Sequence, residues 1–217
     1  MENSFTRPPD GGPLYTETQW HALIKEPWNA ASALLFAGMA VYWLYRLRGQ
    51  WGQRRFLSFC LGLLLVGGIG GTLFHGLRVS RWFLLMDVLP ILLIAVGLSL
   101  WLWRRLLPAL FAPVGVVALF FLAQVLAHRF LPRAVAINTG YALMALMIVV
   151  PLLLVLRRNR WVGAPGILTA VVLFGAALFC RAVDASSGPW ISIGTHWLWH
   201  TLSAASVWLL IRFLTRL

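Results

Sequence analysis

The last apolar run of the chain, residues 194–214, reads GTHWLWHTLSAASVWLLIRFL. This run decides the fold class, because about 20 apolar residues in a helix that rises about 1.5 Å per residue cross the hydrocarbon of a bilayer. Its first turns also hold two histidines, His196 and His200. An ionisable side chain inside a membrane is costly unless it pairs with another group or serves a function. The two histidines are therefore expected to pair with other residues of the chain or to share a function with them.

The composition excludes an ordinary soluble domain. The chain has 217 residues, of which 60% are hydrophobic and 11% are charged, and its mean hydropathy is +0.82. A soluble protein of this size could not bury so much apolar surface. The apolar runs are continuous, whereas the strands of a membrane β-barrel alternate, so the composition favours an all-α integral membrane protein.

Seven apolar runs are long enough to span a membrane, and short connections join them. They cover residues 29–47, 55–75, 82–103, 107–127, 134–156, 163–183 and 195–214. We therefore expect a seven-transmembrane helix bundle that forms a single domain, residues 28–217. The preceding residues 1–27 form a polar N-terminal segment, which lacks the apolar core of a signal peptide.

The basic residues predict how the bundle is oriented. With seven spans, the N-terminus and loops 2, 4 and 6 share one side, which holds 7 of the 18 lysines and arginines, and the other side holds 11. The seven are Arg7, Lys25, Arg78, Arg81, Arg129, Arg133 and Arg181; the eleven, in tight clusters, are Arg46, Arg48, Arg54, Arg55, Arg104, Arg105, Arg157, Arg158, Arg160, Arg212 and Arg216. The positive-inside rule places the C-terminus in the cytoplasm and the N-terminus outside. Topology and contact with lipid headgroups explain the net charge of +12, so no nucleic-acid partner is expected.

The acidic residues and the histidines all fall on the outer side or in the helix ends nearest it. They are Glu2, Asp10, Glu17, Glu26, Asp87, Asp184, His21, His75, His128, His196 and His200. Chance would scatter eleven such residues over both sides, so we expect any chemistry in the outer half of the bundle. The two cysteines, Cys60 and Cys180, are expected near opposite ends of their helices, too far apart to pair.

Four ionisable residues inside the spans are expected to meet at one depth. His75 lies about one turn from the outer end of the second run, and Asp87 lies inside the start of the third, so the hairpin between the two runs brings them together. His196 and His200 are four residues apart and therefore share one face of the last helix.

Each of these residues also has a simpler explanation. His75 could be a lone interfacial histidine that bonds to the backbone. Asp87 could form a structural ion pair with Arg78 or Arg81. The two histidines of the last run could anchor the chain at the interface together with their neighbouring tryptophans, as an aromatic belt does.

Three imidazoles and an aspartate are the residue set of a catalytic zinc site. Zinc prefers nitrogen ligands and lowers the pKa of its bound water to about 7, and an aspartate beside that water can take and return the proton. Haem is the alternative cofactor. The two axial ligands of a haem bind its iron from opposite sides, so His196 and His200, which share one helix face, cannot both bind the same haem. His21 and His128 are too peripheral to serve as their partners.

Two carboxylates precede the first span. Glu17 and Glu26 lie in YTETQWHALIKEPWNAASALLFAG, residues 15–38, where Pro27 suits a first helical turn. The two acids could be a solvated pair that caps the helix. They could also be oxygen ligands for a hard cation such as calcium.

The sequence resembles the alkaline ceramidases and their bacterial homologues, within the seven-helix membrane hydrolase superfamily that includes the adiponectin receptors. The similar blocks are YTE (15–17), EPWNAAS (26–32), GGTLFH (70–75), DVLP (87–90), RAVD (181–184) and GTHWLWHTLSA (194–204). They extend over nearly the whole chain, in the same order. The resemblance implies that His75, His196 and His200 bind zinc and that Asp87 acts on the zinc-bound water.

The chain departs from the family pattern at two places. The family usually carries a serine four residues before the histidine of the second helix, and this chain has Gly71 there. We expect the neighbouring Thr72, or Ser32 in the first span, to offer a hydroxyl to the developing oxyanion. Asp87 also follows His75 by twelve residues, which is one more than the family spacing.

We therefore expect a zinc-dependent amidohydrolase that takes a ceramide-like membrane lipid and releases a fatty acid and a sphingoid base. The resemblance also implies a calcium ion beside the first span, with Glu26 and Glu17 as ligands. The expected location is a bacterial inner membrane, with the site toward the periplasm. Two alternatives stay open: a hydrolase of another acylated lipid, and a non-catalytic membrane receptor whose zinc only braces the bundle.

Overall fold

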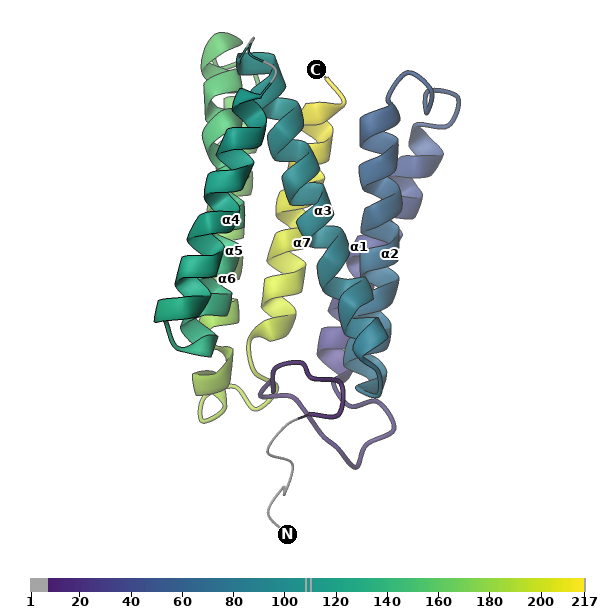
Figure 1. Ribbon diagram of the computed structural model, residues 1–217. Coiled ribbons are helices and arrows are strands. Elements are labelled where there is room, and N and C mark those ends of the chain that lie inside the picture. The colour runs from purple at the N-terminus through teal and green to yellow at the C-terminus, as the bar shows by residue number, and fades with distance from the viewer. Residues whose placement is uncertain (1–7, 108, 110, 217) are drawn as a thin grey trace.

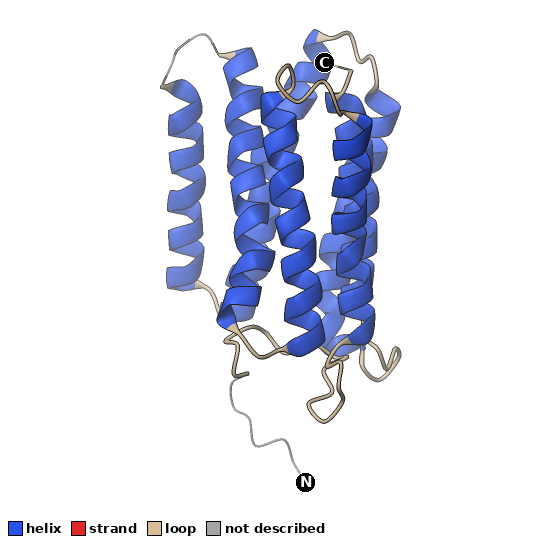
Figure 2. Ribbon diagram, turned by 90° about the vertical axis from the view of Figure 1, so that its right-hand side faces the viewer, coloured by secondary structure: helices blue, strands red, loops and turns tan. Residues whose placement is uncertain are grey.

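The computed structural model describes residues 8–107, 109 and 111–216, and these residues form seven α-helices and no strand (Figure 2). The helices are α1 (Pro27–Arg46), α2 (Arg55–Leu77), α3 (Arg81–Leu106), α4 (Ala112–Phe130), α5 (Arg133–Arg158), α6 (Ala164–Ser187) and α7 (His196–Leu214). Each predicted span corresponds to one helix, so the all-α class is confirmed.

Five of the helices, α2 to α6, are long and apolar enough to cross a membrane. Large apolar side chains also point outward, for example Phe121, Leu122 and Val125 on α4, as a lipid-facing surface requires. Together these features support a multi-pass integral membrane protein. The remaining helices, α1 and α7, carry polar residues in their first turns, and these residues belong to the candidate site described below.

The helices stand side by side, and the two ends of the chain lie at opposite ends of the bundle (Figure 1). Helix α1 packs on α2, α2 on α3 and α6 on α7, and α1 also contacts α7. Residues 8–26 contain no helix and cross beneath one end of the bundle (Figure 1). We call this stretch the N-terminal segment.

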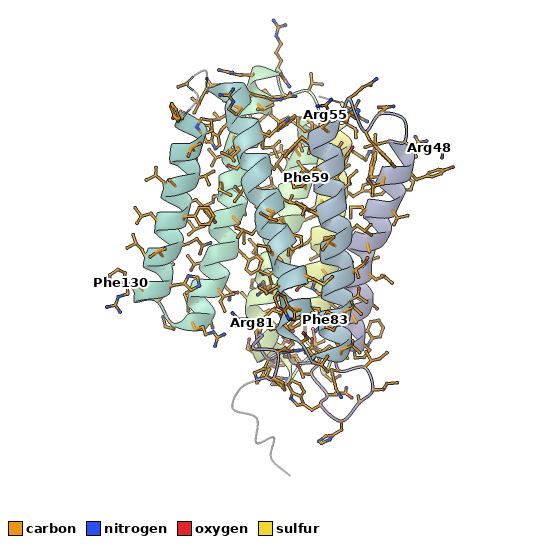
Figure 3. All side chains as sticks on the ribbon, turned by 45° about the vertical axis from the view of Figure 1, so that its right-hand side comes forward. Arg48, Arg55, Phe59, Arg81, Phe83 and Phe130 are labelled. Atoms are coloured by element: carbon orange, nitrogen blue, oxygen red, sulfur yellow. The ribbon has the colours of Figure 1, made fainter. Side chains whose placement is uncertain are left out.

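Arginines mark both ends of the bundle. Arg48 and Arg55 lie at the end that holds the C-terminus, and Arg81 lies at the end that holds the N-terminal segment (Figure 3). Both cysteines are unpaired, as expected. Cys60 lies near the start of α2 and Cys180 near the end of α6, and these helix ends are at opposite ends of the bundle.

The start of α4 differs from the predicted span. The apolar run begins at residue 107, whereas α4 begins at Ala112. Leu107 precedes a proline. Its φ of −113° and ψ of 123° are those of an extended backbone, because the proline ring sterically disfavours a helical conformation of the residue before it. Pro113 then lies in the first turn of α4, where its missing N–H costs nothing.

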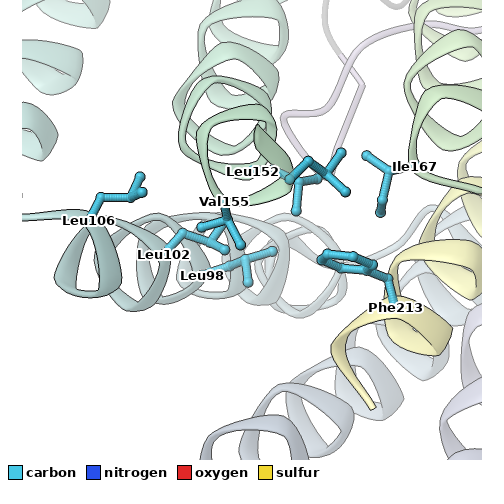
Figure 4. Packing of buried hydrophobic residues seen from close by; sticks show 8 residues of the cluster. Leu98, Leu102, Leu106, Leu152, Val155, Ile167 and Phe213 are labelled. Atoms are coloured by element: carbon cyan, nitrogen blue, oxygen red, sulfur yellow. The ribbon is translucent and has the colours of Figure 1, made fainter. Parts of the chain in front are cut away.

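Apolar clusters fill the end of the bundle that is far from the N-terminal segment. The largest cluster joins late residues of α3, α5 and α7 with an early residue of α6 (Figure 4). It comprises Leu98, Leu102, Leu106, Leu152, Val155, Leu156, Ile167 and Phe213. A second cluster packs Met39 of α1 against Leu61 of α2 and Ile211 of α7. The buried ionisable side chains of the described residues lie at the opposite end.

Glycines in α2 allow two helices to approach closely. A side chain at Gly68 would collide with the backbone of Ala37 in α1. A side chain at Gly70 would collide with Met86 in α3. Small residues bring membrane helices together in this way, and here they bring α1 and α3 against the end of α2 that carries His75.

Candidate metal centre

Three histidines from two helices meet at the end of the bundle that the N-terminal segment covers. His75 lies in the last turn of α2, and His196 and His200 lie in the first two turns of α7. One ligand nitrogen from each of the three lies within 4.8 Å of the others. The exposed fractions of the residues are 0%, 2% and 4%, so their rings face the protein interior. The structure thus brings together the three residues that the sequence predicted as zinc ligands.

One nitrogen of His75 is hydrogen-bonded, and the other is free to bind a ligand. Nδ1 lies 2.5 Å from a carboxylate oxygen of Glu26, and since a carboxylate accepts, Nδ1 carries the proton. Nε2 is buried and has no hydrogen-bond partner among the described residues. Histidines that bind a metal usually donate their other ring N–H to such a carboxylate.

The other two histidines are held by neighbouring backbone and rings. His200 Nδ1 lies 3.1 Å from the carbonyl oxygen of Asn29 and 2.9 Å from the hydroxyl of Ser32, so Nε2 keeps a free lone pair. His196 Nδ1 is buried without a partner in the part of the chain that the structure describes. The ring of Tyr15 packs on His196 at a centroid distance of 4.0 Å.

This donor set fits a zinc ion. A buried polar atom without a partner costs free energy, and a cation that accepts the nitrogen lone pairs removes that cost. Three imidazole nitrogens are a usual protein ligand set of catalytic zinc and leave a fourth position open, whereas calcium and magnesium prefer oxygen.

Asp87 lies in the second turn of α3, against the turn of α2 that precedes His75. A Cβ atom built on Gly71 would lie 2.7 Å from Asp87 Oδ1, so the carboxylate fills the space that this glycine leaves between α2 and α3. The charged groups close enough to act on Asp87 are His75 and Arg181. The three-residue link between the two helices accommodates the twelve-residue spacing that departs from the family pattern.

Glu26, predicted as a calcium ligand, is in contact with three protein donors and with His75. One carboxylate oxygen accepts from the Thr18 hydroxyl at 2.6 Å and forms an ion pair with Arg78. The other accepts from His75, and the side-chain amide of Asn29 lies 3.4 Å away. The residue is completely buried.

Glu17, the second predicted calcium ligand, caps α1. Its two carboxylate oxygens accept from the backbone N–H groups of Trp28 and Asn29, at 2.5 and 2.9 Å. Burial raises the pKa of Glu17, although these two hydrogen bonds act in the opposite direction. The structure thus brings Glu17 and Glu26 to the start of α1, where Asn29 contacts both carboxylates and keeps a buried side-chain oxygen without a partner among the described residues.

Neither predicted hydroxyl donates toward the free histidine nitrogens. Thr72 donates to the carbonyl oxygen of Gly68 at 2.8 Å, a bond within its own helix. Ser32 donates to the carbonyl oxygen of Asn29 at 3.1 Å and lies on the Nδ1 side of His200. Of the two, Ser32 is therefore the one in contact with a histidine.

Asp184 is a buried residue of the site that sequence reasoning left without a role. Its Oδ1 accepts from the backbone N–H groups of Thr195 at 2.7 Å and His196 at 2.9 Å, and so caps α7 where the first histidine stands. Its Oδ2 accepts from the N–H of Thr16 in the N-terminal segment at 3.1 Å. The available signal was the location of Asp184 among the clustered outer-side acids.

Arg181 also lies at this end of the bundle. Its guanidinium carbon lies 4.2 Å from the ring centre of Tyr141 and 5.5 Å from that of Trp199. Its Nε is buried without a hydrogen-bond partner in the described residues. Arg181 and Asp184 both belong to α6. This helix therefore contributes to the site together with α1, α2, α3 and α7.

Comparison of the chain with protein-family models, with curated proteins and with solved structures gives no match. A function for the chain therefore has to be argued from the geometry of its site and from the chemistry of the residues there.

Proposed function

We propose that the chain is a zinc-dependent hydrolase of a membrane lipid amide, in which His75, His196 and His200 hold the metal. The observation that carries the proposal is a set of three buried histidines with one ring nitrogen each within 4.8 Å of the others. His75 and His196 each also have a buried ring nitrogen that lacks a hydrogen-bond partner among the described residues. The resemblance to the alkaline ceramidases supports the reaction class, and the nitrogen-only ligand set supports zinc as the metal.

Two residues beside the histidines have separate roles in this reaction. A bound zinc ion supplies a Lewis acid for the amide carbonyl and acidifies a water molecule. The Asp87 carboxylate, beside His75, takes the proton of the attacking water and returns it to the leaving amine nitrogen. Glu26 holds the Nδ1 proton of His75 and thereby fixes the ring in place.

A groove between α1 and α7 suits the acyl chain of the substrate. It has a volume of about 460 Å³. Its lining residues are mostly apolar: Leu35, Gly38, Met39, Tyr42, Thr201, Ala204, Ala205 and Trp208. Thr201 directly follows His200 in the chain, and none of the three histidines lines the groove. A lipid that moves sideways out of the bilayer could place its chain there and its amide at the histidines.

We further propose that all seven helices cross the membrane, with the N-terminus outside and the C-terminus in the cytoplasm. The split of 7 and 11 basic residues between the two ends supports this orientation. The candidate metal centre would then open toward the outer leaflet, which is the periplasmic side of a bacterial inner membrane.

Released fatty acid tests the reaction. The purified chain with zinc should free fatty acid from a ceramide or from another N-acylated lipid. The Asp87→Asn variant should keep its zinc and lose about 100-fold or more of this activity, because it lacks the proton acceptor. A chain that binds zinc and frees no fatty acid from any of these lipids would favour the receptor alternative, in which the metal only braces the bundle.

A further inference from the structure

Arg78, a buried arginine in contact with the N-terminal segment, has no part in the proposed reaction. Arg78 caps the C-terminus of α2, where its φ of 54° turns the chain out of the helix. The residue is only 1% exposed. A guanidinium so deeply buried needs several acceptors, because removing an unpaired charge from water is costly.

Four oxygen atoms from three residues surround the guanidinium. Asp10 contributes both carboxylate oxygens, one 2.6 Å from Nε and the other 3.1 Å from Nη2. The carbonyl oxygen of Pro13 accepts from Nη2 at 2.9 Å. The fourth oxygen belongs to Glu26, which forms an ion pair with Nη1. We call this arrangement the oxygen cage.

Aromatic rings close the remaining sides of the cage. The ring centres of Phe74, Trp20 and Tyr15 lie 4.7, 5.5 and 5.7 Å from the central guanidinium carbon. Cations are attracted to the faces of such rings, and the rings also exclude water. The oxygen atoms and the aromatic rings around Arg78 therefore all favour a positive charge at this position.

The oxygen cage has the ligand chemistry of a calcium site. Carboxylates together with backbone carbonyls are the ligands that calcium takes in proteins. The resemblance to the ceramidases implies calcium on this segment, yet the carboxylates expected to bind it are used otherwise. Glu26 is bonded to Arg78 and His75, and Glu17 to the backbone of α1. These two residues do not fit a calcium ion while Arg78 holds its present position.

We propose that the Arg78 guanidinium is a built-in cation that takes the place of calcium. It ties the N-terminal segment to the end of α2 through Asp10, and it reaches His75 through Glu26. Arg78 is thus a positioning residue for the metal centre. The inference rests on the proposed function in taking His75 as a metal ligand. It makes both the fold of the segment and the activity of the protein independent of calcium.

The wild-type protein provides the first test. The thermal unfolding midpoint of the full chain in detergent is measured in calcium-free buffer and in millimolar calcium, at the same free zinc concentration, together with the bound zinc. The two midpoints and the two zinc contents should be equal. A midpoint that rises with calcium, or zinc that is lost in calcium-free buffer and kept in calcium, would overturn the proposal.

The Arg78→Ala variant provides the second test. It leaves two buried carboxylates without a cation, so the midpoint should fall by about 10 °C. Calcium or guanidinium ion should restore part of this loss, although neither affects the wild type. The matched control is Arg81→Ala, because Arg81 lies three residues away and is exposed. A variant at Arg78 that unfolds like this control would contradict the proposal.

A milder variant covers the case in which Arg78→Ala does not fold. Asp10→Asn removes one charge of the cage and keeps the pair between Arg78 and Glu26. Its midpoint should fall without any response to calcium, because the internal cation is still present. An unchanged midpoint would show that the cage does not hold the segment. These unfolding data stand even if the protein binds no zinc, so a failure of the proposed function can be told apart from a failure of this inference.

Discussion

At the scale of single residues, Glu26 connects the metal centre to the rest of the protein. It precedes α1 and contacts both His75 and Arg78. Burial alone would raise the pKa of Glu26, but the hydrogen bond with His75 and the charge of Arg78 lower it. An ionised carboxylate in this place keeps the proton on Nδ1 of His75 and leaves Nε2 to the metal.

Glu26→Gln should therefore weaken zinc binding. The amide keeps one oxygen near His75 but loses the charge that orients the ring. We expect the zinc affinity to fall by about 10–100-fold, as measured by competition with a chelator. The control is Glu17→Gln, since this buried carboxylate lies on the same segment and bonds only to the backbone of α1. Equal zinc affinities of the two variants would argue against the role of Glu26.

Gly71 leaves the space between α2 and α3 that the Asp87 carboxylate occupies. Any side chain there would meet the Asp87 carboxylate, and its Cβ would also lie 3.2 Å from Ala33. Gly71→Ser should displace Asp87 and lower fatty-acid release by about 100-fold while zinc stays bound, because small misplacements of reacting groups are costly. Gly62→Ser is the matched control in the same helix, since nothing lies within 4 Å of that position. Unchanged activity of the Gly71→Ser variant would contradict this role of Gly71.

At the scale of helices, the start of α7 depends on a cap from another helix. Asp184 of α6 accepts the N–H groups of Thr195 and His196, which no residue inside α7 could satisfy. Asp184→Ala should lower the free energy of unfolding by about 1–2 kcal/mol, measured by denaturation in detergent. Ser186→Ala is the control, because that side chain is exposed and bonds within α6. A loss no larger than that of the control would contradict the capping role.

The positions of the helices could be predicted from the sequence to within a few residues, but their caps could not. Apolar runs of about 20 residues are a strong signal, because the thickness of the bilayer fixes their length. Only the start of α4 differed by more than a few residues, and the proline after Leu107 explains it. The cap of α7 by Asp184 joins residues eleven and twelve positions apart, and no local pattern marks such a bond.

At the scale of the whole molecule, the buried ionisable side chains lie at one end of the bundle and the largest apolar clusters lie toward the other. The clustering of acids and histidines on one side predicted this separation, and the hairpin between α2 and α3 explains why His75 and Asp87 lie at the same end. The contact between Asp10 and Arg78 joins residues 68 positions apart and could not be predicted. The N-terminal segment has no periodic pattern, so only the folded structure reveals which side chains it buries.

The metal content of the purified chain tests the central claim most directly. The wild type should hold about one zinc per chain, as a single three-histidine site requires. His200→Ala should lose this zinc, whereas His128→Ala, which removes an exposed histidine on α4, should keep it. A wild-type chain without zinc, or a His200→Ala variant that retains it, would contradict the assignment of the three histidines as a metal centre.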